Sequence, residues 1–384
     1  MDKGDVLRYL KFSIVPLFYL PLLIVASLLG GWFPLANLAF IILCYFTLDK
    51  FSEAQEKREP LRWPWLLDAM MYLYLLLSLV AIAAVLASAS GGQNAILSWA
   101  DEEFGMSISP LASASFFSIL AAAISTGFVL SINMVVGHEL THRTVSKFDI
   151  FMGNLALSIV GDSQFAISHI YCHHKNVATP LDAATARRGE SIYRFIIRSS
   201  LEQYREAWQF EKSRLIKTSR SVFSPANRLL LWISLTFVIA ITAFIMAGWV
   251  GGLLYILIAA VSKITYESTN YIQHYGLVRI PGQRVRTDHS WDCRSAFSSA
   301  VLLNLTRHSD HHASPNKAYW HLDTTNSRML IDQGYVVQIV RALYPTYWFN
   351  MMEEKLLYWE LHHATEDERE IIAQQRQAWR KENV

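Results

Sequence analysis

The feature that most constrains this chain is the gathering of its apolar residues into long blocks that few charged residues interrupt. Hydrophobic residues make up 52% of the 384 residues and charged residues only 17%, against roughly 25% charged residues in soluble proteins. A helix needs about 20 apolar residues to cross a bilayer core. Six segments meet or approach that length: about 12–30, 33–48, 65–87, 112–137, 228–247 and 250–272. The sequence therefore predicts an all-α, integral membrane protein with six transmembrane helices.

Some details of these segments add to the prediction. The second segment is short, and the fifth and sixth are expected to form a tight hairpin about Gly248, Gly251 and Gly252. The apolar stretch 151–160 has only about ten residues, so we expect it to be a buried or re-entrant helix. No small-residue cleavage site follows the first apolar stretch, which predicts a retained first span.

The basic residues predict the orientation of these helices. The loop 88–111, after the third segment, contains no Lys or Arg. Basic residues instead lie before the first segment and after the second: Lys3, Arg8, Lys11, Lys50, Lys57, Arg58 and Arg62. Because basic loops favour the cytoplasmic side, we expect segments 138–227 and 273–384 and both termini to be cytoplasmic.

Composition also limits the partners and the number of domains. The net charge of +2 does not favour nucleic acid as a partner. Cys44, Cys172 and Cys293 lie far apart, and without a CxxC pair the chain has no built-in rubredoxin or zinc ribbon. We therefore expect residues 1–384 to form one membrane-embedded domain that receives electrons from a separate protein.

Nine of the thirteen histidines fall in four short segments. One segment is HELTH, with two histidines at i and i+4, and the others are HIYCHH, HSDHH and NYIQH. The predicted topology places all four at the same membrane face. The nine residues are His138, His142, His169, His173, His174, His274, His308, His311 and His312.

So many imidazoles together indicate more than one metal ion. Imidazole binds iron, zinc and copper, but a single zinc is satisfied by three or four protein ligands. Two ions sharing nine histidines have four or five ligands each, which leaves room for O2. We expect His321, His362 and His363 to be ordinary surface residues, and the sequence leaves open whether His289 orients a ligand.

A ligating imidazole commonly donates its second N–H to a carboxylate or carbonyl. Glu139, Asp182, Asp292 and Asp310 are within sequence reach of the histidine segments, and Glu267 lies two helical turns before His274. An acid within a span is costly unless it faces the protein interior. We therefore favour Glu267 and Asp310 as the acids that orient ligands. Glu139 would be the general base if HELTH belonged to a zinc protease.

The strings GHELTHR (137–143), HIYCHHKNVATPLD (169–182), NYIQHYGL (270–277), DHSW (288–291) and LNLTRHSDHHASP (303–315) carry a family resemblance. The chain resembles the membrane-bound alkane 1-monooxygenase and xylene monooxygenase family, within the wider fatty acid desaturase-like group, over roughly residues 10–350. The resemblance implies two iron ions on the nine histidines, in the bacterial inner membrane. It implies insertion of one oxygen atom from O2 into a terminal or benzylic methyl group. Electrons would come from rubredoxin or a ferredoxin-type reductase.

The substrate and part of the chemistry stay open. Where the family usually has Glu-His-Asn, this chain has Ser168-His169-Ile170, so an alkane, an alkyl-aromatic compound or a terpenoid remain candidates. A desaturase on the same scaffold is the main alternative, and a zinc metalloprotease or a metal transporter is remote. Met134, Ser131 and Gly127 share a face of the fourth segment with the first histidines. They line a substrate route or serve only helix packing.

Overall fold

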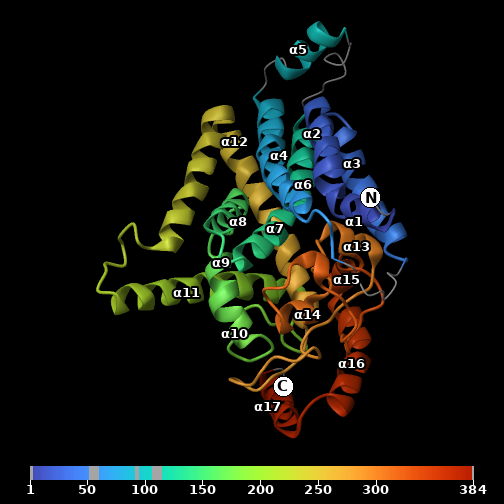
Figure 1. Ribbon diagram of the computed structural model, residues 1–384, viewed down its shortest axis with the longest axis vertical. Coiled ribbons are helices and arrows are strands. Elements are labelled where there is room, and N and C mark those ends of the chain that lie inside the picture. The colour runs from blue at the N-terminus through green and yellow to red at the C-terminus, as the bar shows by residue number, and fades with distance from the viewer. Residues whose placement is uncertain (1–2, 52–59, 91–94, 106–114, 383–384) are drawn as a thin grey trace.

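The computed structural model describes residues 3–51, 60–90, 95–105 and 115–382 (Figure 1). Within these ranges the named elements are all helices, and an isolated β-bridge pairs Asp292 with Leu330. The predicted all-α class is therefore confirmed. Part of the basic loop after the second segment, including Lys57 and Arg58, lies outside the described residues, as do residues 112–114.

Helices of the N-terminal half form the upper part of Figure 1 together with α12. They are α1 Lys3–Ile14, the π-helix η1 Val15–Tyr19, α2 Leu20–Leu29, α3 Phe33–Leu48, α4 Trp65–Ala89, α5 Ala95–Phe104, α6 Phe116–Leu130, α7 Ile132–His142 and α8 Lys147–Ile159. The remaining helices are α9 Phe165–Ser168, the π-helix η3 His169–His173, α10 His174–Asn176, α11 Ile192–Lys217, α12 Arg228–His274, α13 Ala296–Val301, α14 His308–Ala313, the 3-10 helix η4 Tyr319–His321, α15 Tyr335–Ala342, α16 Pro345–His362 and α17 Glu366–Glu382.

Among the described residues, four continuous helical stretches are long and apolar enough to cross a membrane: Asp5–Leu29, Trp65–Ala89, Phe116–His142 and Arg228–His274. The apolar helix α3 has 16 residues. These helices coincide with the predicted spans, but the count of six crossings remains a prediction. The most apolar stretch of α12 has only 11% of its residues buried inside the protein, against 72% for that of α6 and α7. This stretch of α12 therefore presents most of its apolar surface to its surroundings.

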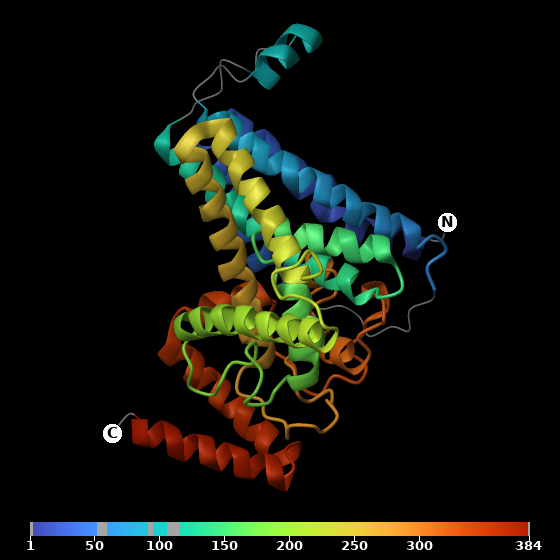
Figure 2. The same ribbon diagram turned by 90° about the vertical axis from the view of Figure 1, so that its left-hand side faces the viewer.

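The 47-residue helix α12 is a hairpin of two helical arms, visible in Figure 2. The helix breaks at Ala247 and Gly248, and Gly248 adopts a φ of +59°, which glycine tolerates without strain. A Cβ on Gly251 would collide with the carbonyl oxygen of Ala243, so the missing side chain allows the arms to approach closely. The predicted hairpin between segments 228–247 and 250–272 is confirmed.

Helix α8 contains most of the stretch 151–160 and packs along α7. The two helices approach closely at glycines, since a Cβ on Gly137 would lie 2.7 Å from Leu157 and one on Gly153 would lie 2.8 Å from Thr141. The histidines of HELTH fall inside α7, so the helix continues beyond the predicted end of the fourth span at residue 137. This close packing fixes the height of the first histidine pair.

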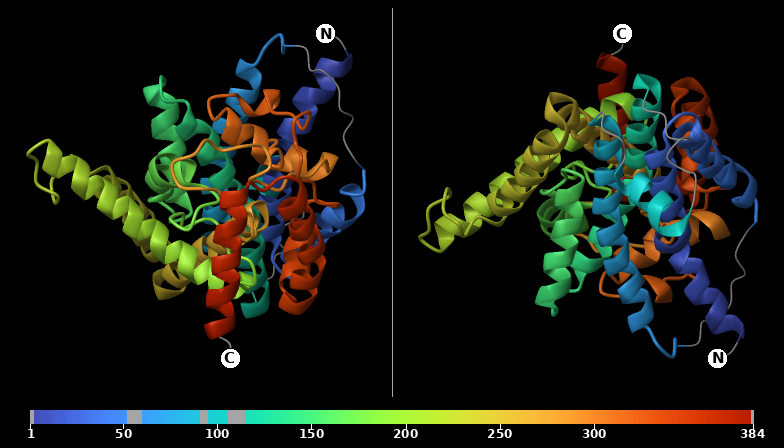
Figure 3. Two further views of the ribbon diagram at one scale, coloured as in Figure 1. Left: turned by 90° about the horizontal axis from the view of Figure 1, so that it is seen from below. Right: turned by 90° about the horizontal axis from the view of Figure 1, so that it is seen from above.

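Helices α9 to α11 and α13 to α17 gather below the long apolar helices (Figures 1 and 2). Seen from below, α11 extends outward past the other helices (Figure 3). A buried aromatic cluster that includes Tyr271, Tyr275 and Trp348 joins the end of α12 to α16. The histidine segments lie where these lower helices meet the ends of α7 and α12.

Candidate metal centre

The structure brings all nine histidines together in two adjoining groups. The group of five consists of His138, His142, His169, His174 and His311. The group of four consists of His173, His274, His308 and His312. Within each group the candidate ligand atoms all lie within 4.8 Å of one another, an arrangement that matches the expected division of four or five histidines per ion.

Helix α7 supplies the first pair at i and i+4, so both side chains lie on one helix face. The Nε2 atom of His138 lies 2.8 Å from that of His311, and the Nε2 atom of His142 lies 3.1 Å from that of His169. Both residues of α7 are buried. One end of the fourth apolar stretch therefore forms a wall of the group of five.

The second histidine segment is a π-helix, in which the backbone N–H of His174 donates to the carbonyl of His169, five residues earlier. The wider turn places His174 over His169, with their Nε2 atoms 3.0 Å apart. The neighbouring His173 points into the other group, with its Nε2 atom 3.3 Å from that of His312. Isolated π-turns are frequent at functional sites, and here the turn divides adjacent histidines between the two groups.

The third segment also serves both groups. On α14, His308 and His312 lie at i and i+4 with Nε2 atoms 3.1 Å apart, and His308 lies 3.0 Å from His274 at the end of α12. His311 faces the group of five. Asp292 fixes the start of α14, because its carboxylate accepts hydrogen bonds from the backbone N–H (2.9 Å) and hydroxyl of Ser309.

These contacts fit a pair of metal ions better than a hydrogen-bond network. Every contact within the groups is between Nε2 atoms, at 2.8 to 3.3 Å. A neutral imidazole has one N–H, so a set of converging nitrogens cannot satisfy one another. Nitrogens that bind one ion at about 2.1 Å and near right angles lie about 3 Å apart. The donor set therefore suits two ions.

The environment keeps these rings in the neutral form that binds metal. Burial, reinforced by neighbouring imidazoles, lowers the pKa well below the usual 6.5 for five of the members that lie outside the apolar spans. They are His169, His174, His308, His311 and His312.

Two histidines are oriented by contacts at their other ring nitrogen. His173 lies with Nδ1 2.9 Å from the buried carboxylate of Asp182, which also accepts a hydrogen bond from Thr185. His274 lies with Nδ1 3.4 Å from the carbonyl oxygen of His289, and the ring of His289 lies 3.0 Å from Glu368 on α17. Asp182 was among the acids near the histidine segments in sequence, but the spacing did not identify it as the partner of a histidine. Nothing in the sequence indicated a role for Glu368.

Glu267 and Asp310, the acids favoured by the sequence, and Glu139 lie in other interactions. Glu139 pairs with Arg143 at 3.0 Å, and Glu267 accepts hydrogen bonds from Ser199 (2.7 Å) and Gln203 (2.8 Å) and pairs with Lys263 (2.8 Å). Asp310 accepts from Lys317 (2.6 Å) and from the backbone N–H of Asp323 (2.9 Å). In the described contacts none of the three meets a histidine. Glu267 lies two turns before His274 along α12, and its partners Ser199 and Gln203 belong to α11.

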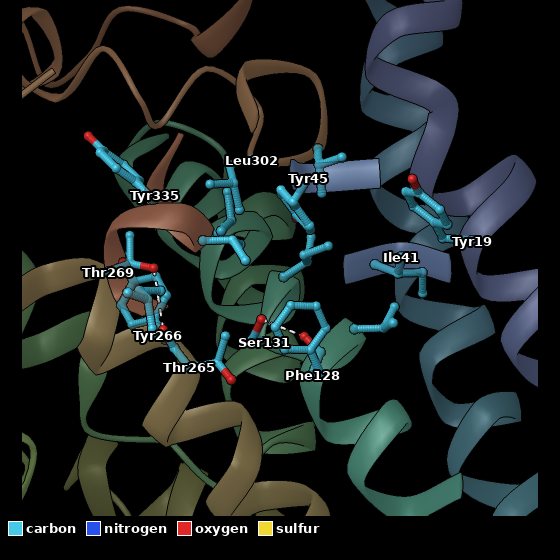
Figure 4. Close-up of a pocket in the computed structure, with 16 residues that line it drawn as sticks. Tyr19, Ile41, Tyr45, Phe128, Ser131, Thr265, Tyr266, Thr269, Leu302 and Tyr335 are labelled. Atoms are coloured by element: carbon cyan, nitrogen blue, oxygen red, sulfur yellow. Dashed lines mark hydrogen bonds between the residues drawn. The ribbon is translucent and has the colours of Figure 1, made fainter. Parts of the chain in front are cut away.

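A narrow apolar pocket lies beside the group of five, with ≈ 560 Å³ of space that includes its open end (Figure 4). Tyr266 joins the pocket to the centre, since its hydroxyl lies 3.5 Å from Nδ1 of His138. Ser131, Thr265 and Thr269 also line it, but each hydroxyl donates to a backbone carbonyl of its own helix. These hydroxyls are therefore already engaged, which favours an apolar occupant.

Of Met134, Ser131 and Gly127, which were predicted to line a substrate route or to serve packing, one lines the pocket. Ser131 lines the pocket. Gly127 instead serves packing, because a Cβ there would lie 2.7 Å from Val261 and 2.8 Å from the carbonyl oxygen of Ile258. Met134 is fully buried. Of these three residues, Ser131, at the junction of α6 and α7, is thus the one that faces the pocket.

Helices of this length and apolarity, with two histidine groups at their ends, define a membrane-associated protein with a metal-binding centre. The fatty acid desaturase family model matches residues 114–342. The chain belongs to the fatty acid desaturase family, and the matched residues contain all nine histidines of the two groups. The resemblance expected from the sequence is confirmed.

Several proteins of known name are similar to this chain. Alkane 1-monooxygenase 1 of Alcanivorax borkumensis is 36% identical over 63% of this chain and 61% of its own length. Alkane 1-monooxygenase of Pseudomonas putida is 35% identical over 64% and 62%. The xylene/toluene monooxygenase hydroxylase component of Pseudomonas putida is 28% identical over 62% and 64%. The chain thus spans about three fifths of the length of these relatives.

Proposed function

We propose that this protein is a membrane monooxygenase that hydroxylates a methyl group of an apolar hydrocarbon at two iron ions. The observation that carries the proposal is the apolar pocket beside the two adjoining groups of histidines, with Tyr266 between the pocket and His138. The relatives named alkane 1-monooxygenase and xylene/toluene monooxygenase support this reaction class. The nine ligands would be the members of the two groups.

Bound iron would supply the reduction of O2 that an inert C–H bond requires, and side chains alone cannot supply it. In the overall reaction, one oxygen atom enters the C–H bond and the other becomes water, with two electrons from a donor and two protons. The protein holds the imidazoles neutral and aims their Nε2 atoms at common points. Tyr266, and Phe165 stacked 4.7 Å from the ring of His169, shield the centre on the pocket side.

The pocket supports a hydrocarbon as the substrate. Its serine and threonine hydroxyls donate to the backbone, so binding relies on apolar contact. We propose an alkane, an alkyl-aromatic compound or a terpenoid that enters from the lipid. Desaturation of a fatty acyl or other lipid chain at the same centre is the second candidate, and the family match supports it.

The electron donor is expected to be a separate protein, because the sequence has no CxxC pair. We propose rubredoxin or a ferredoxin-type reductase as the separate electron donor. Lys175 and Arg187 are exposed near the second histidine segment and suit an acidic partner. Arg188 contributes less, because it pairs with Glu353 and Glu360. We further propose six crossings of a bacterial inner membrane, with the centre and both termini cytoplasmic.

Isotope labelling tests this function. The purified protein in lipid nanodiscs, with iron, rubredoxin and its reductase, would be given an alkane or an alkylbenzene under ¹⁸O-labelled O2. We expect a primary or benzylic alcohol that carries one labelled oxygen atom. An unlabelled alkene would establish the desaturase alternative. Neither product, together with bound zinc instead of iron, would contradict both.

A further inference from the structure

Helix α11 is attached to both ends of the α12 hairpin. The carboxylate of Glu211 accepts a hydrogen bond from the backbone N–H of Arg228 (3.0 Å), where α12 begins. Ser199 donates to Glu267 (2.7 Å), near the end of α12. Because the arms of α12 are apolar enough to span a membrane, their ends mark the edge of the hydrocarbon core. Helix α11 therefore lies at that edge, where it runs across the lower ends of the arms (Figure 2).

One flank of α11 is apolar and open. Tyr193, Ile197, Leu201 and Tyr204 follow one another at helical spacing and are 37 to 65% exposed. The hydroxyl of Tyr204 donates to the carbonyl of Gly161 (3.0 Å). Gly161 adjoins Ala259 of the second arm of α12. The apolar flank of α11 thus faces the side from which the hairpin rises.

The flank beside it on the exposed face of α11 is charged. Its exposed residues include Arg194, Arg205, Gln209 and Lys212. The whole helix has six basic and three acidic side chains, so it has a net positive charge. An apolar flank next to a basic one is the pattern of a helix that lies in a membrane surface.

We propose that α11 lies in the plane of the membrane surface as a lipid-binding helix, in addition to the helices that cross the bilayer. Its apolar flank enters the boundary between acyl chains and headgroups, and its basic residues contact anionic phospholipid headgroups. Tyrosine is well suited to this boundary. The flank meets the exposed apolar surface of the first arm of α12 near Gly161, which adjoins Thr236, the neighbour of Phe237 (63% exposed). This continuity favours lipid over a second protein copy.

Site-specific photo-crosslinking tests the placement. A benzoylphenylalanine would be introduced at Ile197, Leu201 or Gln209 in the full chain, in nanodiscs of neutral and anionic phospholipid. We expect lipid adducts from positions 197 and 201 and few or none from position 209. Tyr193 gives the same comparison with a smaller change of side chain, if the Ile197 variant is not produced. Equal adducts at all positions, no lipid adducts at 197 and 201, or crosslinks to a second copy would overturn the proposal.

The lipid preference is tested by R205Q/K212Q in the background with the probe at Leu201. We expect the adducts of the parent protein to be enriched several-fold in anionic lipid, and the double variant to lose this enrichment while still forming adducts. S213A, which changes an exposed uncharged neighbour, is the matched control and should keep the preference. An unchanged preference in R205Q/K212Q would refute the role of the basic residues.

Discussion

The direction in which each imidazole points depends on single contacts at its outer nitrogen. His173 meets Asp182, and His274 meets the carbonyl of His289. The spacing of the histidine segments predicted which residues gather, because i and i+4 positions share a helix face. It could not predict which acid meets a ring, since Asp310 lies inside a histidine segment whereas Asp182 lies eight residues after His174. Only the fold separates Asp182 from Asp310, which pairs with Lys317.

Replacing Asp182 tests this separation. D182N removes the charge that faces His173, so we expect iron affinity to fall by about 10- to 100-fold, the usual effect of losing a carboxylate behind a ligand. Chelator competition on the purified protein measures it. D310N is the control and should bind iron as the unsubstituted protein does. Equal losses in both variants would mean that Asp182 has no special role.

Ser131 is the residue through which pocket length can be tested. S131W fills space beside the group of five, so we expect activity to shift toward shorter hydrocarbons while iron content is unchanged. Product profiles across a series of chain lengths measure the shift. G127A instead forces a Cβ against Ile258 and Val261, and it should destabilise the fold by about 1–3 kcal/mol. An unchanged product profile in S131W would show that this pocket is not the substrate site.

At the scale of helices, apolar blocks predicted the long elements and even the hairpin of α12. The π-helix η3 was not predictable, because its wider turn is held by the tertiary positions of the two histidine groups. The direction of α11 could not be predicted from the sequence either, since it depends on salt bridges between different helices, such as that of Glu211 with Arg228.

Glu211 links α11 to α12 and gives a pH-dependent prediction. Burial alone would raise its pKa, but hydrogen bonds from Arg214 and Arg228 outweigh this and lower it to about 2, from a usual 4.5. A lowered folded pKa gives stability that is present above pH 4.5 and lost as pH falls toward 2. E211Q should therefore lower stability by about 2 kcal/mol at pH 7, allowing for solvent screening of the partly exposed arginines.

Thermal unfolding in detergent measures this effect. The gap in Tm between E211Q and the unsubstituted protein should narrow as pH falls below 4.5. E202Q, which breaks a partly exposed pair with Arg198, is the control and should cost about 0.2–1 kcal/mol. A gap in Tm that does not change with pH would show that the charge of Glu211 is not the cause.

Helix α17 gives a second prediction at this scale. Glu368 holds His289 and Arg286, and the carbonyl of His289 lies behind His274. We expect E368A to release this loop and weaken iron binding in the group of four more than in the group of five. Mössbauer spectra of the iron-loaded variant would then change for one of two iron components. E366A, at the exposed start of α17, should leave both components unaltered.

Across the whole molecule, four segments far apart in sequence meet to form two groups of histidines below the apolar helices. The sequence was enough to predict that they share one end of the helices. It could not assign them to groups, because adjacent residues such as His173 and His174 separate, while His138 and His311 join from opposite halves of the chain. That assignment is a property of the folded chain.

We propose that each of the two groups holds one iron ion. The most direct measurement is the metal content per chain of protein purified in detergent from iron-replete cells, by mass spectrometry, for the unsubstituted protein, H274A and H169A. We expect two iron ions per chain in the unsubstituted protein. We expect H274A and H169A each to lose iron, and the first Mössbauer component to weaken should differ between the two variants. A single zinc ion per chain with no iron, or full metal content in both variants, would contradict it.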